Sequence, residues 1–232
     1  MSEPKLKTNL DTNLIKLVAI IAMTIDHIGG AFFLEYPIFR WIGRMAFPLF
    51  CYCLTVGMLY THDIKRYVMR LGIFALISQP FWILAFNAED FVGNLLNLNI
   101  FFTLVVSLLT TWGFQQKKWW LFVGGSLLLS CINFDYSLTG VILMMIFYLC
   151  RNKPALGILL YTLSYLPALN GYMEDPLALK IGGHAIGFEI FSLLALPLIY
   201  IHTNSKLKIS KWFFYLYYPA HLLAIYLIQL FL

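Results

Sequence analysis

The residues of this chain best suited to chemistry are ionisable side chains set inside long apolar stretches. Asp26 and His27 stand within the first apolar segment, and Arg44 lies near the start of the second. An ionisable side chain at the centre of a membrane helix costs at least about 2.5–3.5 kcal/mol, so such residues are functional candidates by default. A neutral imidazole can accept a proton from an amine or a hydroxyl near pH 7. The pattern predicts an intramembrane site that moves protons.

The spacing of these residues limits how they can act together. Asp26 and His27 are adjacent, and neighbouring residues of a helix point about 100° apart, so they do not form a dyad in which Asp orients His. We expect His27 to face a cavity and Asp26 to pair with Arg44, because a buried carboxylate needs a partner or becomes protonated. The alternative is that Asp26 and Arg44 only clamp two helices, with His27 a hydrogen-bonded core histidine.

Further polar residues stand in later apolar segments. The topology described below gathers them in the same outer half of the membrane, with His221 near the middle of its span. They are candidates for lining a cavity, although a lone membrane histidine often only bonds a neighbouring helix, and a carboxylate near a span end can lie at interface depth. These residues are Ser78, Asn97, Asn99, Glu189 and His221.

Metal and nucleophile chemistry find little support in the sequence. The five histidines include no H-E-x-x-H motif or other ligand pair at helical spacing, so no metal site is expected. Cys51 and Cys53 are two residues apart, on different helix faces, and are expected to be small buried hydrophobes. No G-x-S-x-G motif marks a serine nucleophile.

The elements that must position these residues are transmembrane helices. Of 232 residues, 61% are apolar and 12% charged, and a soluble globule of this size cannot bury so much apolar surface. A helix of about 20 apolar residues crosses the bilayer core. We predict an all-α polytopic bundle of about nine helices, at residues 14–34, 41–60, 67–86, 95–114, 119–133, 136–150, 155–169, 185–202 and 212–232.

The charges orient this bundle, since cytoplasmic loops are rich in Lys and Arg. With the N-terminus inside and the C-terminus outside, 13 of the 16 basic residues fall at the inner face. Only Arg40, Arg44 and Lys180 fall outside or near the outer face, where acidic residues gather. The net charge of +5 is therefore an orientation signal that gives no support to nucleic-acid binding. We expect a multi-pass protein of the bacterial cytoplasmic membrane, in contact with lipid.

The chain shows no internal repeat and no linker long enough to divide it. We therefore predict a cytoplasmic polar tail at residues 1–13 and a single transmembrane domain over 14–232. The first span is too long and too polar for a cleaved signal peptide.

Several stretches together resemble TraX-type membrane proteins. The opening helix carries I-D-H-I-G within residues 17–29 (LVAIIAMTIDHIG), and the next carries G-R-x-A-F-P within 40–50 (RWIGRMAFPLF). Residues 67–80 (YVMRLGIFALISQP), 99–103 (NIFFT) and 211–221 (KWFFYLYYPAH) fit as well. The resemblance runs over nearly the whole chain.

The resemblance implies acyl transfer, since TraX-like proteins are associated with N-acetylation of pilin and are similar to membrane acyltransferases that use acetyl-CoA. An early-helix histidine is essential in that broader group, and His27 matches it by position. His27 would then act as a general base, or as a nucleophile through an acetyl-imidazole. Arg44, Asn97 or Asn99 would stabilise the oxyanion, with Asp26 holding Arg44.

Acetyl-CoA would dock on the basic cytoplasmic loops, and the acceptor would enter from outside. That acceptor is a peptide N-terminus, a lipid-linked group or a glycan hydroxyl. Two other classes stay open. A proton-coupled transporter would use the buried Asp, His and Glu residues as a relay, and a non-catalytic assembly factor would tolerate their substitution.

Overall fold

The computed structural model describes residues 6–132 and 134–232, and its elements are almost all helices. Contacts divide the chain into two compact units. Unit 1 comprises residues up to 56 together with 146–208, and unit 2 comprises 57–145 and 209–232. Each unit is built from stretches far apart in the sequence. The single domain expected over 14–232 stays a prediction.

Unit 1 combines helices with a short hairpin. Its elements include α1 (Thr12–Phe32), α2 (Pro37–Gly43), most of α3 (Ala46–Tyr60), the end of α7 (Thr139–Leu149), α8 (Pro154–Ser164), η2 (Leu166–Leu169), β1 (Leu179–Ile181), β2 (His184–Ile186), η3 (Phe188–Ala195) and α9 (Leu196–Tyr200). Helix α2 packs on α1 and on η3. The strands pair antiparallel, with Lys180 opposite Ala185.

The segment before α1 is packed into unit 1, although the sequence predicts a polar tail over 1–13. Asn9 is buried and donates to the Leu198 carbonyl oxygen at 2.8 Å. Asp11 caps α1 by accepting from the Leu14 N–H, and it also accepts from the Ser205 N–H at 2.6 Å. Partial burial alone would raise the pKa of Asp11, but these hydrogen bonds lower it below its ordinary value. Residues 1–5 of the predicted tail lie outside the described residues.

The predicted span 41–60 begins earlier, at Pro37, and is interrupted at Arg44 and Met45. Pro48 explains the interruption, because proline has no N–H to donate to the carbonyl four residues before it. That carbonyl belongs to Arg44, and it accepts a hydrogen bond from the Ser192 hydroxyl at 3.1 Å instead. The break therefore joins the second apolar segment to η3.

The predicted helix 185–202 also differs at its start. Residues 184–186 form β2, because Gly182 and Gly183 take positive φ angles of 57° and 79° and turn the chain back on β1. The helical part begins at Phe188 as a 3₁₀ helix and becomes α-helical only at Leu196.

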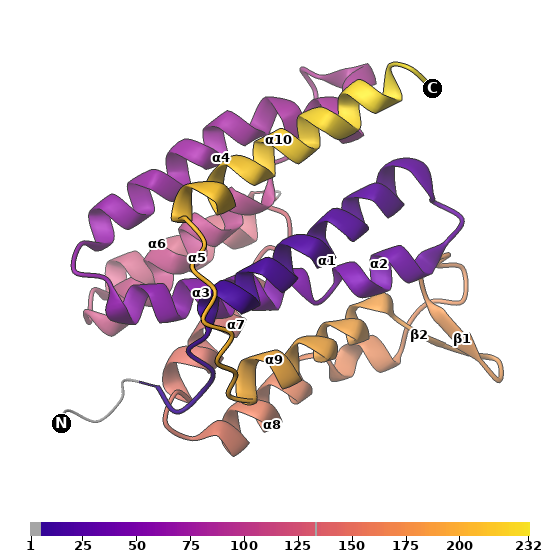
Figure 1. The fold of residues 1–232 in the computed structure, drawn as a ribbon. Helices are drawn as coiled ribbons and strands as arrows, with labels where there is room; N and C mark the ends of the chain where they lie inside the picture. The colour runs from indigo at the N-terminus through magenta and orange to yellow at the C-terminus, as the bar shows by residue number, and fades with distance from the viewer. Residues whose placement is uncertain (1–5, 133) are drawn as a thin grey trace. The chain divides into compact units, whose positions relative to one another are not determined.

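Unit 2 contains most of the remaining helices: α4 (Ile64–Phe86), η1 (Ala88–Asp90), α5 (Ile100–Gln115), α6 (Trp119–Cys131) and α10 (Lys211–Gln229), with the end of α3 and most of α7. Helix α4 lies beside α10 (Figure 1). Phe74 of α4 stacks on Tyr215 of α10 at 5.1 Å between ring centroids. Helix α5 packs on α4 and α6.

The helices have the lengths and compositions of a membrane protein. Within the described residues, three segments are both long and apolar enough to cross a bilayer, namely Thr12–Phe32, Pro37–Tyr60 and Ile64–Phe86. Helices α5, α6, α7 and α8 are apolar but shorter. The count of about nine spans and the orientation of the termini stay predictions.

Candidate functional site

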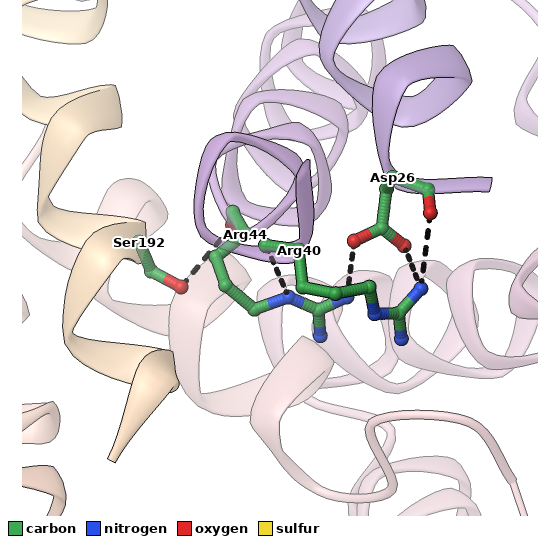
Figure 2. Close-up of polar contacts among 4 residues, drawn as sticks. All are labelled: Asp26, Arg40, Arg44 and Ser192. Atoms are coloured by element: carbon green, nitrogen blue, oxygen red, sulfur yellow. Dashed lines mark hydrogen bonds and ion pairs between the residues drawn. The ribbon is translucent and has the colours of Figure 1, made fainter. Parts of the chain in front are cut away.

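An ion cluster in unit 1 joins the first two apolar segments. Asp26 of α1 accepts from Arg40 of α2 and from Arg44, which follows α2 directly. Arg40 Nη1 lies 2.8 Å from Asp26 Oδ2, and Arg44 Nη2 lies 2.8 Å from Asp26 Oδ1. Figure 2 shows both guanidinium groups turned to the one carboxylate. Each carboxylate oxygen therefore serves a different arginine.

Glycine at position 43 lets α2 approach Asp26. A Cβ atom on Gly43 would lie 2.1 Å from Asp26 Oδ1 and 2.4 Å from Asp26 Cγ. Gly29, one turn further along α1, likewise lets α2 come close at Phe39, because an added Cβ on Gly29 would lie 2.2 Å from Phe39 Cβ. The I-D-H-I-G and G-R-x-A-F-P motifs thus contain Asp26, Arg44 and two glycines that bring the helices together, whereas Arg40 lies just before the second motif.

Gly43→Ala is therefore expected to displace Asp26 and to separate it from Arg44. Overpacking of this kind costs about 1–3 kcal/mol, and the midpoint of thermal unfolding in detergent should fall accordingly. Gly72→Ala is the matched control, because Gly72 is also helical but has nothing within 4 Å of an added Cβ. Equal midpoints for the two variants would contradict the assigned role of Gly43.

The surroundings of Arg44 hold its guanidinium in place. The side chain is 9% exposed, its Nε donates to the Arg40 carbonyl oxygen at 3.3 Å, and its Cζ lies 5.0 Å from the centre of the Phe188 ring. Ser192 binds the Arg44 carbonyl (Figure 2). Arg44 is thus fixed by α1, α2 and η3 together.

His27 follows Asp26 on α1 and is partly buried. The pair of Asp26 with Arg44 expected from the sequence is present, and the catalytic roles of these residues stay predictions. Arg40 was missed, because the second helix was expected to begin after it. Its spacing of four residues before Arg44 puts both side chains on one helix face, and this signal could have identified it.

In unit 2, the structure brings Asn97 and Asn99 together around Gln79 of α4. Gln79 Nε2 donates to the Asn97 carbonyl oxygen at 2.8 Å, and Gln79 Oε1 accepts from Asn99 Nδ2 at 2.8 Å. Asn99 also donates to the Ala75 carbonyl oxygen, and its Oδ1 accepts from the Phe101 N–H. Asn99 is therefore the N-cap of α5, which explains why this helix begins at Ile100 instead of 95.

The other predicted residues lie in different settings. Ser78 of α4 is fully buried, and its hydroxyl has no hydrogen-bond partner within the part of the chain that the structure describes. His221 of α10 is buried, and its Nδ1 lies 3.0 Å from the Tyr217 carbonyl oxygen of the same helix. Glu189 of η3 is exposed beside Phe188.

A cavity of about 550 Å³ opens in unit 2 between the ends of α4 and α10. Its lining includes Glu89, Asp90 and Tyr226 but none of the residues predicted for the site. Across residues 6–132 and 134–232, no group of three His, Cys, Asp or Glu side chains is placed to hold a metal ion. The ion cluster in unit 1 is therefore the candidate site.

Comparison with known proteins agrees with the motifs. The model of a family described as "TraX protein" matches residues 11–229. A probable fimbrial assembly protein, FimC of serogroup H1 from Dichelobacter nodosus, is 36% identical over 104 residues, which are 41% of this chain and 43% of that protein. An uncharacterized protein of Rickettsia prowazekii is 54% identical over 46 residues, which are 20% of this chain and 18% of that protein. The chain thus covers less than half of either relative, and no solved structure matches it significantly.

Proposed function

Because this chain belongs to the TraX protein family, we propose that it is an integral-membrane acetyltransferase. It would move an acetyl group from cytosolic acetyl-CoA to an amine or hydroxyl at the outer side of the membrane. The observation that carries the proposal is the buried cluster of Asp26, Arg40 and Arg44, whose Asp26 directly precedes His27 in α1. The cluster would supply fixed positive charge, and His27, one residue after Asp26, would supply a group that can accept a proton.

In this mechanism His27 takes the proton of the acceptor N–H or O–H as the acceptor attacks the thioester carbonyl carbon. Arg44 stabilises the negative charge that develops on the carbonyl oxygen, and Asp26 keeps the guanidinium in place. The C–S bond then breaks, and His27 returns its proton to the departing thiolate. The products are the acetylated acceptor and free thiol, and His27 regains its neutral form. If His27 acts as nucleophile instead, an acetyl-imidazole precedes the acceptor's attack.

The membrane topology is part of the proposal. About nine helices, with the N-terminus inside and the C-terminus outside, place most Lys and Arg residues in the cytoplasm, as the positive-inside rule requires. They also place Asp26 and Arg44 in the outer half of the membrane. Anionic acetyl-CoA would then meet the basic inner loops, and the acceptor would reach the site from outside.

The name of the Dichelobacter relative favours a second candidate, a factor for assembly of a surface structure. If this chain transfers acetyl groups, that name also favours a protein as the acceptor. An assembly factor without catalysis would not need a proton acceptor next to a buried charge cluster. The two candidates therefore differ in whether the polar groups of unit 1 take part in a reaction.

The proposal is tested by incubating the purified protein in detergent with acetyl-CoA and a peptide that has a free N-terminal amine. Mass spectrometry is expected to show the peptide gaining one acetyl group, and a peptide blocked at its N-terminus is the control. A lipid-linked sugar and a glycan are tried as acceptors in the same way. If no acetyl group is transferred to the free peptide, the lipid-linked sugar or the glycan, the assembly factor is favoured. Proton-coupled flux in liposomes without acetyl-CoA would favour a transporter.

A further inference from the structure

The charges of the ion cluster do not cancel. Two arginines share one carboxylate, so Asp26, Arg40 and Arg44 together carry one excess positive charge. Asp26 and Arg44 have side chains only 10% and 9% exposed, which makes an unbalanced charge costly at this depth. Glu189, on the neighbouring η3, forms no ion pair within the described residues.

We infer that Arg40 and Arg44 form a binding site for an anionic group, a carboxylate or a phosphate, carried by the acceptor. The identity of the bound molecule as an acceptor rests on the proposed acetyl transfer. The existence of an anion site does not depend on that proposal. The site differs from the oxyanion role of Arg44 because it holds a stable charge of the bound molecule.

Arg40 has donors left for such a group. Its Nη1 serves both the carboxylate and the backbone oxygen of Asp26, at 2.8 and 3.2 Å, and no other hydrogen bond of its guanidinium is found among the described residues. A guanidinium has five N–H donors in a planar fork that matches carboxylate and phosphate oxygens. The side chain is 28% exposed, compared with 9% for Arg44. Arg40 is therefore the reachable half of the pair.

The contacts and the exposure of Arg40 also fit a ligand that reaches it from outside the ion cluster. Arg40 lies in the last turn of α2, and its guanidinium uses one nitrogen, Nη1, for both of its hydrogen bonds to Asp26. The side chain of Arg40 keeps 28% of its surface exposed. The remaining exposure is what a group that recruits an anion requires.

The experiment measures binding without turnover, using purified protein in detergent. Inorganic phosphate and acetate are titrated against the midpoint of thermal unfolding, with chloride at matched ionic strength as reference. Phosphatidylglycerol is compared with phosphatidylcholine in nanodiscs. Phosphate or acetate should raise the midpoint of the wild type, and Arg40→Gln should weaken the apparent affinity by about tenfold or more, the effect of losing a hydrogen bond to a charged group.

Arg66→Gln is the matched control, because Arg66 is an exposed arginine that pairs with Asp63 in unit 2. It should respond to anions as the wild type does. Arg40→Lys keeps the positive charge but lacks the planar set of N–H donors, so it should bind anions with intermediate affinity. This variant keeps the test valid if Arg40→Gln folds poorly. Stabilisation by phosphatidylglycerol alone would identify a lipid headgroup as the source of the anion.

Equal anion responses in the wild type and Arg40→Gln, or no response in either, would overturn the inference. Acetyl transfer that proceeds without any anion effect would remove only this inference. Anion binding at Arg40 without acetyl transfer would retain the site and remove the proposed function.

Discussion

His27→Ala is expected to lower the rate of acetyl transfer by a factor of about 10²–10⁴, the usual contribution of a positioned general base. The neighbouring carboxylate cannot replace His27 as the general base, because Asp26 is paired with two arginines. The measurement is the initial rate of acetylation of a peptide amine, with the midpoint of thermal unfolding recorded on the same preparation. Expression and thermal midpoint should stay close to the wild type.

His202→Ala provides the control, because His202 is an exposed histidine of unit 1 in the segment after α9. Its activity and stability should match the wild type. If His27→Ala instead fails to fold, His27 is a hydrogen-bonded core residue, and the general-base assignment is wrong. If both variants transfer acetyl at the wild-type rate, the base lies elsewhere.

The helical nature of the chain and its first contacts could be predicted because they follow from local pattern. Apolar runs in the sequence correspond closely to α1, α4 and α10. The need to neutralise a buried carboxylate was enough to pair Asp26 with Arg44, 18 residues away. Both inferences use only the low dielectric of an apolar surrounding, which does not depend on the details of packing.

The features that could not be predicted from the sequence depend on contacts between distant segments and on turn geometry. The interruption at Arg44 follows from Pro48, but only the structure shows that Ser192 takes up the carbonyl that Pro48 leaves. The hairpin before η3 depends on positive φ angles at Gly182 and Gly183, which apolar periodicity does not report. Likewise, only the structure shows that the Asn99 amide caps α5 and bonds Gln79, and its predicted place in a cavity stays a prediction.

The charge cluster offers a way to separate folding from catalysis. Asp26→Ala leaves Arg44 buried without its carboxylate, and breaking a buried pair from one side costs about 3–5 kcal/mol. The free energy of unfolding, measured by denaturation in mixed micelles, should fall by this amount. Arg40 contributes less to the loss because its side chain is 28% exposed and can turn to water.

The double variant Asp26→Leu with Arg44→Met replaces the pair with apolar side chains. Such replacements are often neutral or stabilising by about 1–4 kcal/mol, because the cost of desolvating two charges disappears. We therefore expect the double variant to recover the stability that Asp26→Ala loses, yet to transfer no acetyl groups. Recovery of both stability and activity would make the pair a helix clamp, and recovery of neither would place the role of Asp26 in packing against Gly43. Only a stable, inactive double variant agrees with a cluster retained for chemistry.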